Sequence, residues 1–142
     1  VVFFCQAEDG IRELGRSRGL GDGYKRQTQA RYGVKVTATF ADEPDVSLDV
    51  KEALYRIAQE SMHNTVKHAR ASNITVRLAH ESNEVRLELV DDGQGFDPSG
   101  EFPGHLGLRS MQERARDIGA VLEITSSPGE GTRIILRVPH ED

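Results

Sequence analysis

The segment from Leu48 to Ala69 constrains the fold most, because it repeats small and apolar residues every three or four positions. The repeated positions are Leu54, Ala58, Ser61, Met62, Thr65 and Ala69. This period is typical of an α-helix that buries one face. Such a helix needs an apolar surface to cover, so the rest of the chain must supply one. Ser47 or Asp49 can cap the beginning of the helix, and we expect it to end near residues 69–71.

Alternating apolar and β-branched residues predict the strands that supply this surface. The predicted strands cover residues 34–40, 73–80, 84–90, 121–126 and 132–138. Turn residues at 82–83 and 128–131 join two pairs of strands into hairpins. A second helix is expected from about Leu106 to Gly119, with an apolar stripe of Leu108, Met111, Ala115 and Ile118. This order predicts an α+β, two-layer sandwich with helices on one face of a mostly antiparallel mixed sheet.

The composition argues against several classes of protein. A formal net charge of −5 argues against nucleic acid as the main partner. Cys5 is the single cysteine, so neither an intramolecular disulfide framework nor a cysteine zinc site can form. No apolar run approaches the roughly 18–20 residues of a membrane span. We therefore expect one cytoplasmic domain that makes no membrane contact itself.

Residues 1–27 differ from the rest of the chain. Glycines at 10, 15, 19, 21 and 23 interrupt any helix there, and no strand pattern replaces it. The segment resembles translated adapter sequence at the end of a reading frame, so we interpret it as a non-native or disordered leader. We assign it no function and expect residues 28–142 to form the domain.

The polar face of the first helix carries Glu60, Asn64 and Lys67, with His63 and His68 beside them. These groups suit a metal-bound polyphosphate, because oxygens bind a hard cation and an ammonium group attracts phosphate. Taken alone, the same pattern is more often an ordinary solvated helix face. Glu60-x-x-His63 also matches half of a di-iron carboxylate pattern, but no second copy occurs on another helix.

The irregular span from Asp91 to Gly104 is longer than most connections and is typical of a binding loop or lid. Asp91 follows a strand directly, where its carboxylate can accept a hydrogen bond from an exocyclic amine. Gly93 and Gly95 lack a Cβ, so the backbone can take a positive φ and let a flat ring approach. Taken alone, the sequence is equally compatible with an ordinary tight loop that has no function.

Two further glycine-containing segments can contribute to a site. Gly104-His105-Leu106-Gly107-Leu108 opens the second helix and can expose backbone N–H groups at the positive end of the helix dipole, where phosphate binds. The simpler alternative is that its glycines allow a sharp entry into the helix. Gly131-Thr132 can be a plain hairpin turn, or the Thr132 hydroxyl can reach Asp91 directly or through a water molecule.

In combination, these motifs resemble those of the GHKL ATPase superfamily. Glu60-xxx-Asn64-xx-Lys67-His68-Ala69 resembles its N box, and Asp91-x-Gly93-x-Gly95-Phe96 resembles its G1 box. Gly104 to Leu108 resembles the G2 box, and Gly131-Thr132 the final glycine–threonine element. Residues 30–139 look most like the ATP-binding domain of bacterial sensor histidine kinases of the nitrate-sensor and DesK-like subgroup. A chance match of all four motifs in this order is improbable.

The resemblance implies a Bergerat-type fold that binds ATP and Mg²⁺. Asp91 would bind the adenine amino group, with Gly93 and Gly95 shaping the base pocket and Thr132 supporting it. Asn64 would supply an oxygen to Mg²⁺, while Lys67 and His68 would approach the phosphates. The backbone amides of five residues would bind the phosphates: Gly104, His105, Leu106, Gly107 and Leu108. The main role implied for Glu60 is to orient metal-bound water, and a role as general base comes second to it.

The resemblance also implies a protein histidine kinase that donates the γ-phosphoryl group of ATP to a histidine. None of the five histidines lies in the family's phosphoacceptor motif, so that histidine would lie on a dimerisation domain absent here. The implied partners are this domain, a response regulator and a second copy of the whole protein, which can be membrane-anchored. The alternative is an anti-sigma-factor-like or other regulatory ATP-binding module that acts by partner binding. A third hypothesis, a degenerate nucleotide sensor, is disfavoured by the intact Asn64 and Asp91.

Overall fold

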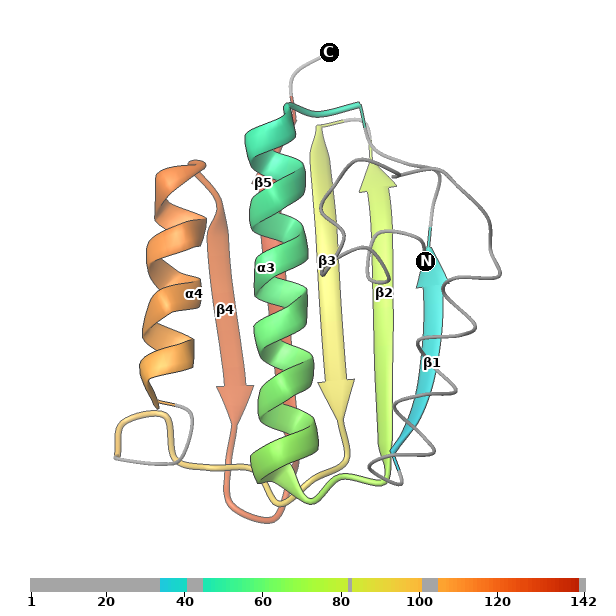
Figure 1. Ribbon diagram of the computed structural model, residues 1–142, viewed down its shortest axis with the longest axis vertical. Helices are drawn as coiled ribbons and strands as arrows, with labels where there is room; N and C mark the ends of the chain where they lie inside the picture. Colours follow the sequence, from blue (N-terminus) through green and yellow to red (C-terminus); the bar gives the residue numbers. More distant parts are fainter. Residues whose placement is uncertain (1–33, 41–44, 82, 101–104, 141–142) are drawn as a thin grey trace.

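The computed structural model describes residues 34–40, 45–81, 83–100 and 105–140 (Figure 1). Its strands are β1 (Lys35–Phe40), β2 (Asn73–Glu81), β3 (Glu84–Asp91), β4 (Val121–Ser126) and β5 (Thr132–Pro139). Its helices are α3 (Leu48–Asn64), the π-helical turn η2 (Thr65–Ala69) and α4 (His105–Asp117). Both α-helices cover the same face of one sheet, so the predicted α+β two-layer sandwich is confirmed. The predicted leader, residues 1–27, lies outside the described residues.

The five strands form one mixed sheet in the order β1-β2-β3-β5-β4. β1 pairs with β2 in parallel, and the three other pairs are antiparallel. The parallel pair is joined by α3, as a parallel connection requires a crossover. Both predicted hairpins, β2–β3 and β4–β5, are present. In this register Asp91, the last residue of β3, lies opposite Thr132, the first residue of β5.

Helix α3 packs the predicted face onto the centre of the sheet. Its beginning is capped by Ser47, whose hydroxyl accepts the Val50 N–H at 3.3 Å. The buried helix residues are Ala53, Leu54, Tyr55, Ile57, Ala58, Ser61 and Met62. They meet the inward side chains of the sheet, which include Ile74, Val76, Leu87, Leu89 and Leu136. The predicted stripe therefore forms the helix's part of the core. The side chain of Ala69 is not among those that the structure describes.

Helix α4 packs beside α3 with the apolar stripe that its sequence predicts. Leu108, Met111 and Ala115 are buried, and Ile118 packs against the same core. The helix ends at Asp117, two residues before the predicted end. Gly119 then takes a φ of +69° and donates its N–H to Arg116 O at 3.0 Å, as expected of a glycine that closes a helix.

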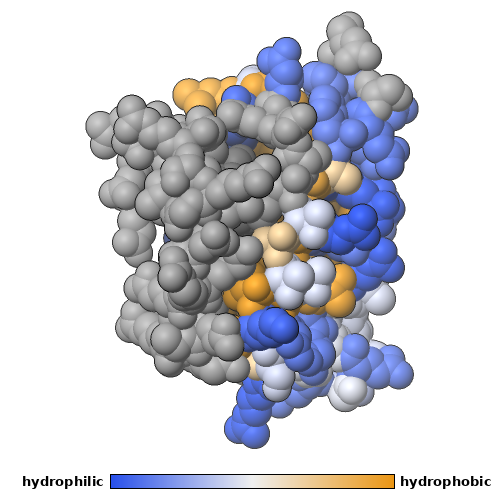
Figure 2. Space-filling view, turned by 90° about the vertical axis from the view of Figure 1, so that its right-hand side faces the viewer, coloured by the Kyte–Doolittle hydropathy of each residue, from blue (hydrophilic) through white to orange (hydrophobic). Residues whose placement is uncertain are grey.

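The other face of the sheet is polar. Figure 2, viewed onto the β1 edge, shows hydrophilic residues along the side away from the helices. On this face the Glu88 carboxylate lies 2.9 Å from both Arg86 and Arg133. The hydrogen bond from Arg133 is the largest cause that lowers the pKa of Glu88. Among the described residues, no helix is both long and apolar enough to cross a membrane.

Candidate functional site

The predicted site residues come together at one end of the sandwich. Figure 1 shows the end of α3, the end of β3 and the beginning of α4 at the same, lower end of the molecule. Asn64 ends α3, Asp91 ends β3, and Gly107 lies in the first turn of α4. Gly104 and the side chains of His68 and His105 lie outside the described residues.

Asp91 is a buried carboxylate held by two donors. Thr65 donates its hydroxyl to one oxygen at 2.9 Å, and Gly93 donates its backbone N–H to the other at 2.9 Å. Asp91 is only 9% exposed. A carboxylate has about four acceptor positions, so these two bonds leave capacity for a further donor. The arrangement suits a hydrogen bond from an amino group.

Thr65, which the sequence placed on the buried helix face, contacts Asp91, and the sequence did not predict this contact. Its hydroxyl lies 3.1 Å from Ser61 O, one turn earlier, as well as 2.9 Å from Asp91. The hydroxyl of Thr132 lies 2.9 Å from that of Ser126, and the supporting role predicted for Thr132 stays a prediction. Thr65 thus ties the helix that carries Asn64 to the strand end that carries Asp91. The helical period placed Thr65 on the buried face, but it gave no signal for the contact with Asp91.

The side-chain oxygen of Asn64 is buried, and folded proteins rarely leave a buried acceptor without a hydrogen bond. Its Oδ1 atom is buried and has no hydrogen-bond partner among the described residues. Leaving a buried acceptor unsatisfied costs about 1–3 kcal/mol. A cation or an ordered water would remove this cost, and amide oxygens are ligands of hard cations. The geometry therefore fits the predicted Mg²⁺ ligand.

The chain departs from an α-helix directly after Asn64. The sequence predicted one continuous helix to residues 69–71, but Thr65–Ala69 form a π-helical turn. Arg70 then ends the turn in the left-handed region, with a φ of 52°. Such wider turns occur frequently at functional sites. Lys67 lies in this turn with an exposed side chain, so the α-helical spacing assumed for Asn64 and Lys67 does not apply to them.

Glu60 and Gly107 touch each other where α3 and α4 approach. A Cβ added to Gly107 would overlap Glu60 Oε1 and lie 2.8 Å from its Cδ. Gly107 therefore allows the carboxylate of Glu60 to lie against the first turn of α4. One turn further along α4, Met111 Sδ lies 3.3 Å from the Oγ atom of Ser61, the residue after Glu60. In the same first turn, Leu106 is 79% exposed, whereas Leu108 belongs to the core.

This contact predicts that the effect of Gly107→Ala depends on Glu60. The added Cβ would displace the carboxylate end of Glu60 from α4, and this loss should offset the gain of up to about 1 kcal/mol that alanine brings over glycine in a helix. In a Glu60→Ala background the same change should raise the free energy of unfolding by up to about 1 kcal/mol. Chemical denaturation of the two single variants and the double variant gives the coupling energy. Additive effects would show that Glu60 does not occupy the space beside Gly107.

The loop after Asp91 is packed against the β4–β5 turn. Gly95 has a φ of +64°, and a Cβ there would overlap Ser127 O. Gly129 donates its N–H to Gln94 O at 2.6 Å. Because Gly95 has no side chain, its backbone can lie against Ser127 O in the β4–β5 turn. The role predicted for Gly95 in admitting a base ring remains a prediction.

Asp92 braces the other side of the same loop, a role that the sequence did not indicate. Its Oδ1 accepts the N–H groups of Ser72 and Asn73 at 2.8 and 2.9 Å. Its Oδ2 accepts the side-chain amide of Asn73 at 2.8 Å. The Asn73 side chain is the largest cause that lowers the pKa of Asp92. These bonds fix the start of β2 to the residue that follows Asp91.

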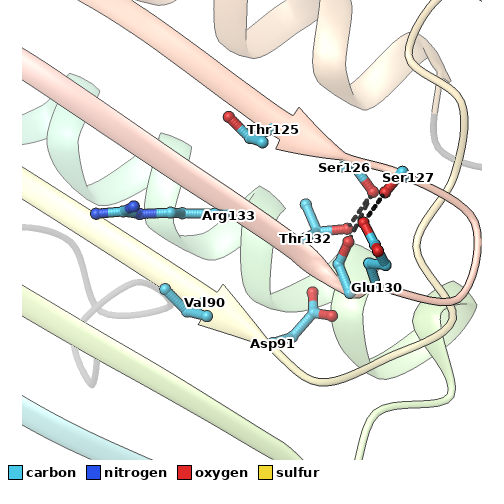
Figure 3. Close-up of a pocket in the computed structure, with 9 residues that line it drawn as sticks. Val90, Asp91, Thr125, Ser126, Ser127, Glu130, Thr132 and Arg133 are labelled. Atoms are coloured by element: carbon cyan, nitrogen blue, oxygen red, sulfur yellow. Dashed lines mark hydrogen bonds between the residues drawn. The ribbon is translucent and has the colours of Figure 1, made fainter.

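A small cavity of about 140 Å³ lies beside Asp91 at the ends of β3, β4 and β5 (Figure 3). It is lined by Val90, Asp91, Thr125, Ser126, Ser127, Glu130, Gly131, Thr132 and Arg133. Pockets that bind ligands usually enclose about 300–1,000 Å³. This hollow is too small for a nucleotide and does not include Asn64. It is a space next to the candidate site, on the side of the β4–β5 turn.

A mixed sheet covered on one face by two helices, with a buried carboxylate and a buried amide oxygen at one end, agrees with the arrangement expected of the GHKL ATPases. Residues 49–142 match the family described as histidine kinase-, DNA gyrase B-, and HSP90-like ATPase, and the chain belongs to this family.

Among curated relatives, the chain is similar to the sensor protein VraS of Staphylococcus epidermidis. The two are 34% identical over 133 residues, which cover 91% of this chain and 38% of VraS. The sensor histidine kinase LiaS of Bacillus subtilis is 40% identical over 94 residues, which cover 66% of this chain and 26% of LiaS. The chain thus spans well under half the length of these relatives.

Among solved structures, the fold is similar to that of the Erythrobacter litoralis EL346 blue-light activated histidine kinase. The TM-score is 0.69 at 25% sequence identity, and the match covers 85% of this chain and 41% of that protein. The match to a kinase supports the identification of the fold and of its family.

Proposed function

We propose that this chain is the ATP-binding catalytic domain of a two-component sensor histidine kinase. The observation that carries the proposal is the buried Oδ1 of Asn64, which has no hydrogen-bond partner within the described part of the chain. Asn64 directly precedes Thr65, whose hydroxyl bonds to Asp91. Membership of the ATPase family and similarity to two sensor proteins support it.

The residues divide into a base end and a phosphate end. At the base end, Asp91 accepts a hydrogen bond from the adenine amino group while Thr65 and Gly93 keep its carboxylate in place. At the phosphate end, Asn64 supplies an oxygen to Mg²⁺, and Lys67 provides a positive charge. His68 and the backbone of Gly104 to Leu108 complete the proposed phosphate contacts. Glu60, which lies against α4, orients metal-bound water in this proposal.

Magnesium would depend on few protein ligands. The described residues contain no group of three or more His, Cys, Asp or Glu side chains that could hold a metal ion. Mg²⁺ usually keeps several waters and takes one or two protein ligands together with substrate phosphates. Asn64 fits that pattern, and the bound ion would neutralise charge on the transferred phosphoryl group.

The partners follow from the same proposal. We propose that the γ-phosphoryl group passes to a histidine on a dimerisation domain of the same kinase, and from there to a response regulator. The whole kinase would act as a homodimer, with this domain in the cytoplasm, where ATP is available.

Calorimetric titration of the chain with ATP tests the proposal directly. We expect saturable binding in excess Mg²⁺ and clearly weaker binding when EDTA removes the ion. Equal affinity under both conditions would contradict the magnesium-binding role. The absence of any binding would contradict the nucleotide-binding function.

The isolated chain should bind ATP without labelling itself. Transfer needs a phosphoacceptor histidine in its sequence context, and we expect none of the five histidines here to serve. Incubation with γ-³²P-ATP, followed by alkaline gel electrophoresis that preserves phosphohistidine, measures this. Robust label on a histidine of this chain would contradict the assignment of the acceptor to a separate domain.

A further inference from the structure

Ser126, the last residue of β4, connects two segments on either side of Asp91. Its hydroxyl accepts the Phe96 N–H at 2.9 Å, which anchors the loop that follows Asp91. The same hydroxyl donates to Gly131 O at 2.9 Å and lies 2.9 Å from the Thr132 hydroxyl. Figure 3 shows Ser126 and Thr132 paired at the end of the sheet, near Asp91. One small side chain thus joins the loop, the turn and the first residue of β5.

The two segments that Ser126 joins also fit closely around Asp91 itself. Gly131 has a φ of +73°, and a Cβ there would overlap the backbone oxygen of Asp91. Gly93, in the same loop as Phe96, donates its N–H to the Asp91 carboxylate. A shift of the loop at Phe96 would therefore move a donor that orients this carboxylate.

We propose that Ser126 is a positioning residue for the base end of the nucleotide site, an inference that rests on the proposed function. Ser126 does not need to touch the nucleotide. It holds the loop from Asp92 to Phe96 against the β4–β5 turn, and this keeps the Gly93 N–H on Asp91. Loss of the hydroxyl removes the oxygen of Ser126 that accepts the Phe96 N–H and loosens the loop at this end, while the bond from Gly129 to Gln94 O remains. Recognition of the adenine amino group then weakens, while the phosphate end at Asn64 is unchanged.

A matched pair of substitutions separates the hydroxyl from the shape of the side chain. Ser126→Thr keeps the hydroxyl, and Ser126→Val has the shape of that threonine variant without the hydroxyl. Ser126 lines the cavity, so the added methyl groups lie beside an open space. Ser127→Ala is the control, because the Ser127 hydroxyl bonds to Glu130 within the turn itself. Ser126→Ala repeats the deletion with a smaller side chain if the valine variant does not fold. Calorimetry with ATP and with inosine triphosphate, which lacks the amino group, measures base recognition.

We expect Ser126→Val to weaken ATP binding about threefold to tenfold, the loss expected for one net hydrogen bond. Binding of inosine triphosphate and the ratio of ATP affinities with and without Mg²⁺ should stay as in the wild type. Ser126→Thr and Ser127→Ala should bind ATP as the wild type does.

An unchanged preference for ATP over inosine triphosphate in both hydroxyl-free variants would overturn the positioning role. An equal loss for both nucleotides would also overturn it, because that result indicates general destabilisation. If the wild-type chain binds no ATP, the proposed function itself fails, and this inference fails with it.

Discussion

Asn64→Ala should abolish most of the Mg²⁺ dependence of ATP binding. The variant removes the buried amide oxygen that has no other partner in the described part of the chain. Loss of a group that holds or orients a metal typically costs on the order of 10- to 100-fold in affinity, and we expect a loss of that size in excess Mg²⁺. Binding in EDTA should change little, because no ion is then present to use the oxygen. Calorimetric titrations under the two conditions give both affinities.

Asn83→Ala is the matched control for this prediction. Asn83 is exposed in the turn between β2 and β3, at the end of the sheet away from Asp91. Its substitution should leave both titrations unchanged. If Asn64→Ala and Asn83→Ala retain the same ratio of affinities with and without Mg²⁺, Asn64 is not a ligand of the ion.

Asp91→Asn should remove the preference for adenine. An amide keeps the shape of the side chain and an oxygen for the Gly93 N–H, but it replaces a charged acceptor by a neutral group. Hydrogen bonds to charged groups contribute about 1.5–3 kcal/mol, so ATP binding should weaken about 10- to 150-fold. Inosine triphosphate, which lacks the amino group, should be affected much less. Competition titrations with the two nucleotides measure the difference.

Asp92→Asn provides the control, because this neighbouring carboxylate faces Ser72 and Asn73 instead. We expect it to lower the free energy of unfolding and to keep the preference for ATP. A variant at Asp91 that still prefers ATP as strongly as the wild type would remove Asp91 from base recognition.

Periodicity was sufficient to predict the elements of the fold. The helical stripe around Leu54 and Met62, and the alternation in β3, arise because one face of each element must be buried. The end of α3 was harder to predict, because the π-helical turn after Asn64 contains Thr65, which contacts a strand distant in sequence. Thr65 contacts both Ser61 O and Asp91, and nothing in the local sequence indicates that the second contact exists.

The site residues were predicted by motif, whereas their mutual contacts were not. The type of residue at Asn64 and Asp91 indicates the chemistry, since an amide oxygen suits a cation and a carboxylate suits an amine. The pairing of Glu60 with Gly107 depends on how closely two helices approach, and spacing along one helix cannot reveal it. The roles of Asp92 and Ser126 depend in the same way on segments that are distant in sequence.

The central claim is that Asn64, Asp91 and the beginning of α4 surround one nucleotide. An NMR titration of the ¹⁵N-labelled chain with Mg-ATP tests it most directly, because each backbone amide reports separately. We predict that the amides of residues 64–67, 91–93 and 106–108 shift together and saturate at the same ATP concentration. Shifts confined to one of these segments, or centred on the polar face around Glu88, would contradict a shared site.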